Sequence, residues 1–200
     1  MLSIHVTDTG TKIPARHWRE GQAGDPSGPE GYRSLSGLES ILRRYAEAGV
    51  DLDRCVPISP INPNFNCHGY TFTRNHEGGW LPGRLVDQIL ADNGFRKIDQ
   101  MDALPGDVLI YRNKVDAVEN AGAVVHSGVV ERITSDGVYA TSKFGAFAVI
   151  RHEVNELTPL YQADIEFYHT DRPGGRFLTS VDGTSIESGW SSILAGESPF

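Results

Sequence analysis

One short stretch of the sequence places a cysteine at the expected start of a helix. A loop rich in proline and asparagine ends at Asn66, and an apolar and aromatic segment begins at Cys67. Asparagine is a preferred N-cap, because its side chain accepts a hydrogen bond from a first-turn amide. A thiol at this place feels the positive end of the helix dipole, which favours the nucleophilic thiolate. Cys67 is therefore a candidate nucleophile, and the alternative is a small buried apolar residue.

A histidine further along the chain is the candidate general base. His126 is the only titratable group in the apolar run from Val124 to Val130. If the helix that starts with Cys67 packs on this strand, the imidazole can take the thiol proton and return it to a leaving group. Backbone amides at the helix start, including that of Cys67, can then hold the oxyanion. The alternative is a histidine with a structural role in the strand.

A catalytic imidazole needs a third group that fixes its tautomer. The turn at Asp136 and Gly137 predicts that residues 138–143 pair with the histidine strand. The polar residues of this strand are Thr141, Ser142 and Lys143, and strand alternation sends Ser142 to a different face from the other two. We choose Ser142 as the third residue, with Thr141, Lys143 and, after the next strand, His152 left open.

Three blocks of the sequence resemble the NlpC/P60 superfamily. The blocks run from Asn66 to Tyr70, from Leu104 to Tyr111 and from His126 to Val130. The family pattern has Asp-Cys-Ser-Gly at the nucleophile, Pro-Gly-Asp before a strand, and His-x-Gly on the base strand. The resemblance covers roughly residues 60–152 and implies a papain-like cysteine peptidase or amidase. It also implies Cys67 as nucleophile and His126 as general base, with bacterial cell-wall peptides as the substrate of many members.

Composition limits the partners that we expect. The formal net charge of −8 argues against a nucleic-acid binder, which needs a basic patch, and against an anionic membrane surface. No run approaches the roughly 18 apolar residues of a membrane span. The first eleven residues lack the basic start and apolar core of a secretory signal. We therefore expect a protein that is cytoplasmic at synthesis, with export by a route without a cleaved signal left open.

The remaining cysteine and histidines offer two further alternatives. A disulfide between Cys55 and Cys67 is less favoured than two thiols without a signal peptide. Zinc ligand atoms are present in these cysteines, His68 and His76, but the paired spacing of a zinc site is missing. We therefore expect no metal and no cofactor.

Periodicity predicts helices first and then a meander of strands. The expected helices are 36–48, one that starts at Cys67 and 85–92, and the expected strands are 3–6, 95–98, 108–111, 124–133, 138–143, 147–151 and 165–169. This order predicts an α+β fold of the NlpC/P60 type with the helices on one side of an antiparallel sheet. We assign residues 1–33 to an N-terminal extension or loop, 34–170 to the catalytic domain, and 171–200 to a Gly/Ser-rich tail.

The function predicted from the sequence is cleavage of an amide bond through a Cys67 thiolate. The expected substrate is a peptide or a peptidoglycan fragment. A toxin-like effector with a delivery or immunity protein as partner is one setting for such an enzyme. Two alternatives stay open, a non-catalytic interaction or scaffold protein of the same fold, and a thiol enzyme that catalyses acyl transfer or glutamine deamidation.

Overall fold

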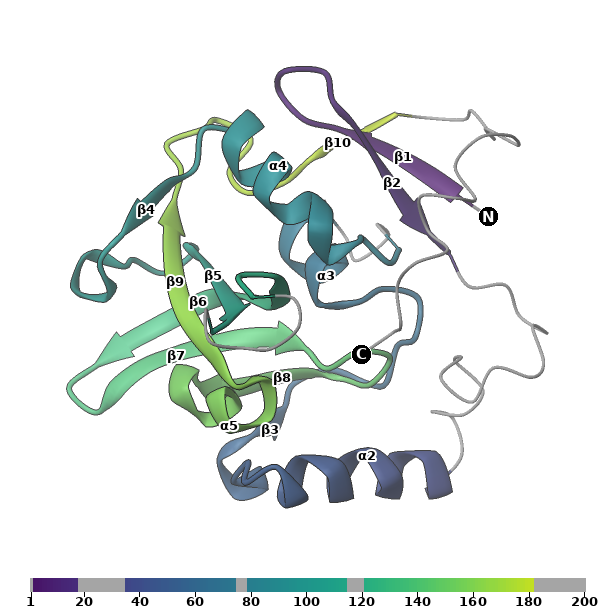
Figure 1. The fold of residues 1–200 in the computed structure, drawn as a ribbon, viewed down its shortest axis with the longest axis vertical. Coiled ribbons are helices and arrows are strands. Elements are labelled where there is room, and N and C mark those ends of the chain that lie inside the picture. The colour runs from purple at the N-terminus through teal and green to yellow at the C-terminus, as the bar shows by residue number, and fades with distance from the viewer. Residues whose placement is uncertain (1, 18–34, 75–78, 115–120, 182–200) are drawn as a thin grey trace.

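The computed structural model describes residues 2–17, 35–74, 79–114 and 121–181. Its centre is a seven-stranded sheet in which every pair of neighbouring strands is antiparallel (Figure 1). The strands lie in the order β3-β8-β7-β6-β5-β9-β4. Their bounds are β3 Val56–Pro57, β4 Arg96–Ile98, β5 Val108–Asn113, β6 Val124–Thr134, β7 Gly137–Lys143, β8 Val149–Glu153 and β9 Ala163–His169. The α+β class and the antiparallel sheet are confirmed.

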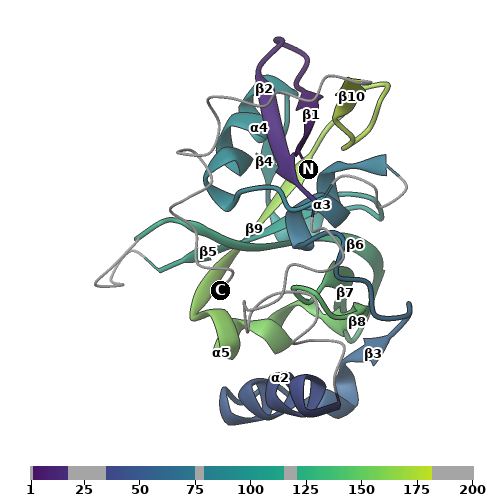
Figure 2. The ribbon, with the colours of Figure 1, turned by 90° about the vertical axis from the view of Figure 1, so that its right-hand side faces the viewer.

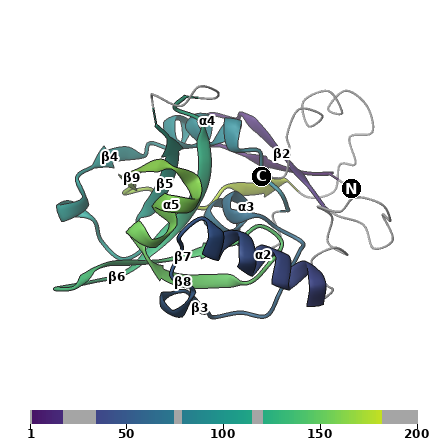
Figure 3. The ribbon, with the colours of Figure 1, turned by 60° about the horizontal axis from the view of Figure 1, so that its bottom comes forward.

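The helices cover both faces of this sheet. They are α2 Leu35–Glu47, α3 Cys67–Phe72, α4 Val86–Asp92 and α5 Thr158–Tyr161, with short 3-10 helices at Leu52–Arg54, Gly83–Leu85, Gln100–Asp102 and Val154–Leu157. Figure 2 shows α3 and α4 on one side of the large sheet and α2 and α5 on the other. Figure 3, in which the bottom of Figure 1 comes forward, shows α2 in front of the part of the sheet that contains β8. The prediction of helices on one face only is therefore wrong.

The side chains of β5 explain why both faces are covered. Val108 and Ile110 belong to the core shared with α3 and α4, whereas Leu109 and Tyr111 belong to the core shared with α5. All four are buried. A strand that is apolar at every position needs a partner on each face, in contrast to the alternating pattern of a half-exposed strand.

A second sheet packs beside α4. It has the order β10-β1-β2, with β1 at Leu2–Val6, β2 at Lys12–Arg16 and β10 at Thr179–Val181. Ile13 and Ala15 of β2 are fully buried in the core that α3 and α4 share with the large sheet. Leu178, just before β10, belongs to the same core and is 5% exposed. Parts of the assigned N-terminal extension and C-terminal tail are thus ordered strands. Residues 18–33 and 182–200 lie outside the described residues.

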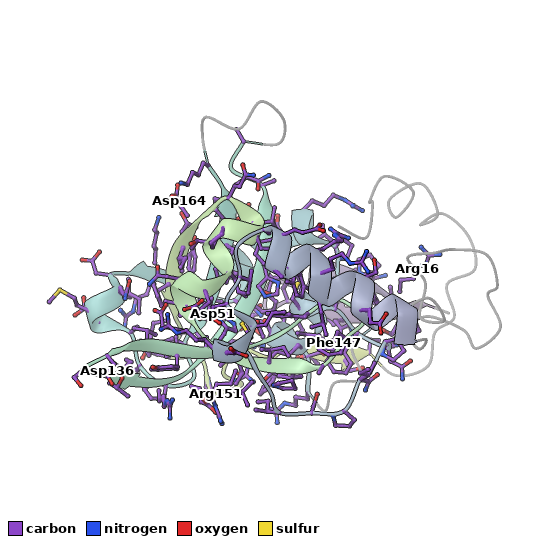
Figure 4. All side chains as sticks on the ribbon, turned by 90° about the horizontal axis from the view of Figure 1, so that it is seen from below. Arg16, Asp51, Asp136, Phe147, Arg151 and Asp164 are labelled. Atoms are coloured by element: carbon purple, nitrogen blue, oxygen red, sulfur yellow. The ribbon has the colours of Figure 1, made fainter. Side chains whose placement is uncertain are left out.

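Most of the predicted elements are confirmed with small shifts at their ends. The helix expected at 36–48 is α2, and the helix expected at 85–92 is a 3-10 turn followed by α4. The strand expected at 147–151 begins two residues later, because Phe147 donates its amide to the carbonyl of Phe144 and closes a turn. The hairpin turn of β6 and β7 lies at Asp136, at the outer end of the sheet (Figure 4).

Candidate functional site

Asn66 fixes the start of the helix that carries the candidate nucleophile. Its side-chain oxygen accepts hydrogen bonds from the amide of Gly69 at 2.9 Å and from the amide of Leu81 at 3.1 Å. Its side-chain nitrogen donates to the carbonyl of Leu81 at 2.8 Å. The predicted N-cap is confirmed, and the same side chain also fastens the helix start to a second segment. Cys67 is the first residue of α3.

The thiol of Cys67 is buried and surrounded by groups that favour a negative charge. Its residue is 8% exposed, and burial raises the pKa of the thiol to about 11. Hydrogen bonds from the backbone amides of Ser127 and His68 and the positive charge of Lys143 act in the opposite direction on this pKa. The resting state at neutral pH is therefore the thiol, held in a position where several groups can stabilise the thiolate.

The second cysteine has the same exposed fraction and different electrostatic surroundings. Cys55 is also 8% exposed and is a free thiol, as is Cys67. Burial, together with the carboxylates of Glu156 and Asp51, raises the pKa of Cys55 to about 11, and the charge of Arg54 acts in the opposite direction. Asp51 lies just beyond the end of α2 (Figure 4). Carboxylates near a sulfur oppose the thiolate, whereas amide N–H groups and a cation favour it.

His126 is buried against aromatic rings on one face of the sheet. Nδ1 lies 3.1 Å from the hydroxyl of Tyr161, and the two rings stack with centroids 4.7 Å apart. The ring of Tyr111, which is its partner across the strand pair, lies 5.4 Å away. Burial lowers the pKa of His126 well below its ordinary value, with smaller contributions from His152 and His68. The imidazole is therefore neutral at pH 7, as a general base must be.

The thiol of Cys67 and the imidazole of His126 lie on opposite faces of strand β6. The hydroxyl of Ser127 bonds Nδ1 of His68 at 2.8 Å and the hydroxyl of Thr71 at 3.0 Å, so α3 packs on the Ser127 face of β6. Neighbouring side chains of a strand point to opposite faces, which places the ring of His126 on the other one. The sulfur of Cys67 accepts a hydrogen bond from the backbone amide of Ser127, the residue after His126. Within the described part of the chain, Nε2 of His126 has no hydrogen-bond partner.

The predicted third residue bonds a different histidine. The hydroxyl of Ser142 lies 2.8 Å from Nε2 of His152, not against His126. Ser142 lies opposite Gly128 in the strand pair, and His152 comes from β8 on the same face. The role assigned to Ser142 as partner of His126 is therefore corrected. The group that occupies this place is the hydroxyl of Tyr161.

The two other polar residues of the same strand face α3. Thr141 accepts a hydrogen bond from the hydroxyl of Tyr70 at 2.9 Å. Lys143 is fully buried near Phe65.

Sequence reasoning missed Tyr161 as the partner of His126, because no local pattern links a tyrosine at the end of α5 to a strand residue 35 positions earlier.

No metal or membrane element emerges from the described residues. Among them, no group of three or more His, Cys, Asp or Glu side chains is arranged to hold a metal ion. His76, one of the ligands considered for zinc, lies outside this part of the chain. No helix in the described ranges is both long and apolar enough to cross a bilayer.

Comparison with known proteins gave no match. No family model matches the chain, and neither the curated proteins nor the solved structures contain a significant match.

Proposed function

We propose that this chain is a cysteine hydrolase of the NlpC/P60 type that cleaves an amide bond in a peptide or peptidoglycan fragment. Cys67 is the nucleophile and His126 the general base. The thiolate attacks the carbonyl carbon, and the amides of Ser127 and His68 that border the sulfur are the available donors for the oxyanion. The amine leaves with a proton, and water then releases the acyl group from the sulfur.

The observation that carries this proposal is the contrast between the two cysteines. Both are 8% exposed, so packing alone treats them alike. Cys67 stands at a helix start with amide hydrogen bonds and Lys143 beside it, whereas Cys55 has two carboxylates beside it together with the opposing charge of Arg54. The amides and the cation act to stabilise a negative charge on Cys67, against the burial that raises the pKa of both thiols to about 11.

The protonation state of His126 supports its role as a base, although a rearrangement must bring the ring and the sulfur together. Its imidazole is neutral, and a hydrogen bond from Nδ1–H to the hydroxyl of Tyr161 would leave the Nε2 lone pair available. Nε2 has no partner among the described residues. Catalytic hydrogen bonds are often formed only in the substrate complex. The reaction requires the ring or a bound water to bring Nε2 into contact with the sulfur.

The test compares wild type, Cys67→Ala and Cys55→Ala. Each protein is incubated with peptidoglycan fragments and with cell protein extract, and the products are read by mass spectrometry. We expect products with wild type and Cys55→Ala and none with Cys67→Ala, because the two variants remove equally buried thiols. Identical profiles from all three proteins would contradict the proposal. The masses also separate hydrolysis from acyl transfer and from deamidation.

A non-catalytic scaffold of the same fold is the second candidate. The burial of Cys67 and its raised pKa favour it, because a structural cysteine has both properties. Labelling with iodoacetamide, followed at both cysteines in one sample, separates the two candidates. Both thiols have a raised pKa of about 11, so faster labelling at Cys67 requires an active form in which its thiolate is stabilised. An enzyme that forms this state should label at Cys67 at least about tenfold faster than at Cys55, since thiolate is the reactive form. Equal rates at the two positions would favour the scaffold.

A further inference from the structure

Two arginines meet at one aromatic ring beyond the end of α3. The guanidinium carbon of Arg176 lies 4.3 Å from the centroid of the Phe177 ring, and that of Arg74 lies 5.2 Å from the same centroid. Each contact between a cation and the ring is favourable, but two cations around one ring repel each other. None of the ion pairs between described residues includes either arginine. An anion that contacts both guanidinium groups would therefore relieve their repulsion.

Arg176 also has a donor group that nothing in the described structure satisfies. The residue is half-buried, and its buried Nε has no hydrogen-bond partner among the described residues. Burial lowers the pKa of Arg176, because the charged guanidinium is partly removed from water. A buried donor without an acceptor is unfavourable, and a charged donor more so. A ligand that brings oxygen acceptors to this place would gain these hydrogen bonds.

Arg172, in the same loop, has the contacts that a structural arginine requires. Nε and Nη2 donate to the carboxylate of Asp8, and Nη1 donates to the carbonyls of Gly175 and Phe177. These bonds fix the loop that leads into β10. The described hydrogen bonds and ion pairs give Arg176 no comparable task, although it lies only four positions further along the chain.

Two contacts fasten the arginine pair to the helix that begins with Cys67. The amide of Leu178 donates to the carbonyl of Phe72, the last residue of α3, at 2.8 Å. Arg74 follows two residues later, and its side chain reaches the ring of Phe177. A helix rises about 1.5 Å per residue, so the pair lies roughly 10 Å along α3 from the candidate nucleophile. An extended peptide spans that distance in about three residues.

We propose that Arg74, Arg176 and Phe177 form a binding site for a carboxylate of an acidic peptide. Each guanidinium presents N–H donors in a planar fork that matches the two oxygens of a carboxylate, and the ring holds both forks at one place. The formal net charge of −8 disfavours a nucleic acid, which needs a larger basic surface than two side chains.

The assignment of this site to the substrate of Cys67 rests on the proposed hydrolase function. It then narrows the substrate class to peptides with an acidic side chain about three residues from the scissile amide. The carboxylate site itself does not depend on the reaction.

The experiment measures the equilibrium binding of three probes to the full chain by isothermal titration calorimetry. The parent protein carries Cys67→Ala, so that no probe is consumed. The probes are an acetylated and amidated triglutamate, the corresponding triglutamine, and a thymidine trinucleotide, which offers phosphates in place of carboxylates. Arg74→Gln and Arg176→Gln each remove one charge. Arg132→Gln is the matched control, because this arginine lies 4.3 Å from the centroid of the Tyr139 ring on the β6–β7 hairpin.

We expect the parent protein to bind triglutamate at least about tenfold more tightly than triglutamine or the trinucleotide, because hydrogen bonds between two charged groups are the strong ones. Arg74→Gln and Arg176→Gln should each weaken triglutamate binding about tenfold, and Arg132→Gln should leave it unchanged. Equal binding of the two peptides, tighter binding of the trinucleotide, or unchanged triglutamate binding in both folded arginine variants would overturn the inference.

The three-probe comparison uses only the parent protein, so it decides the inference even if circular dichroism shows that an arginine variant does not fold. Binding is measured without turnover. A failed hydrolase assay would therefore leave a positive binding result intact, and a lack of triglutamate binding would leave the chemistry proposed for Cys67 to its own test.

Discussion

The hydroxyl of Tyr161 lies 3.1 Å from Nδ1 of His126, and the two rings stack at an interplanar angle of 17°. When Nδ1–H donates to this hydroxyl, the imidazole is in the tautomer whose Nε2 lone pair is free. The stack fixes the ring plane as well. Tyr161 therefore contacts His126 in two ways, and in the proposed hydrolase it would be a positioning residue that acts through the imidazole.

Replacement of Tyr161 by Phe should separate the hydrogen bond from the stack. We expect kcat to fall about fivefold with KM unchanged, because one net hydrogen bond contributes about 1 kcal/mol to the geometry of the base. The measurement is steady-state kinetics on the substrate found for wild type, with nuclear magnetic resonance of the His126 ring nitrogens to follow the tautomer. Tyr139→Phe, on β7 against Arg132, is the control. Unchanged kcat and tautomer in Tyr161→Phe would exclude the orienting role.

Replacement of Gly69 by Ala should destabilise the protein although Ala favours helices. In an open helix this change stabilises by roughly 0.5–1 kcal/mol. Here a Cβ would come 2.1 Å from the carbonyl oxygen of Gly79 and 3.2 Å from the Cβ of Phe65. We expect a loss of about 1–3 kcal/mol in the free energy of unfolding, because backbone must move to admit the methyl group. Urea unfolding measures the change.

Gly174→Ala is the matched control for that substitution. Its Cβ would meet only the end of the Arg172 side chain, at 3.3 Å. This guanidinium is held by Asp8 and has to shift by only a few tenths of an ångström, so the free energy of unfolding should change by less than about 1 kcal/mol. A Gly69→Ala protein as stable as this control would show that α3 does not pack against Gly79 as closely as described.

His169 should make stability fall as pH rises. Nδ1 lies 2.6 Å from Asp107, and Nε2 lies 3.0 Å from Asp171. Hydrogen bonds to Asp171 and Asp107 raise the pKa of His169 above its ordinary 6.5. The folded state thus binds this proton more tightly than the unfolded state does. The contribution is complete below pH 6.5 and is lost as pH rises through the raised value. Urea midpoints should show this slope in wild type and not in His169→Gln.

Lys143 should produce a slope of the opposite sign. Burial lowers its pKa from 10.5 to about 7, so the unfolded state binds the extra proton more tightly. Stability therefore rises with pH from 7 toward 10.5 as this difference in proton binding disappears. Lys143→Met should unfold at higher urea concentration at neutral pH and lose this rise. A Met variant that is less stable than wild type at pH 7 would mean that the ammonium has an anionic partner.

Local chemistry made the start of the candidate site predictable from sequence. The N-cap at Asn66 depends on residues within three positions along the chain, and the structure has it as expected. The strand pairing of 138–143 with the histidine strand depends on one turn at Asp136 and Gly137. Contacts of this kind follow from composition and short-range geometry.

Longer-range features were not predictable in the same way. The choice between Ser142 and Tyr161 as partner of His126 depends on how α5 packs, which no spacing in the sequence indicates. The apolar residues at 108–111 did carry a signal for a sheet covered on both faces, in their lack of alternation. Strand β2 was missed because Pro14 and the flanking charges Lys12 and Arg16 make a weak strand pattern.

The last strand has a consequence for any shortened form of the protein. The amide of Leu178, just before β10, donates to the carbonyl of Phe72 at the end of α3. A chain cut after β9 would leave β1 without its outer neighbour and the helix of the candidate nucleophile without this anchor. Limited proteolysis near residue 171 would thus act on Cys67 from a distance, through its helix.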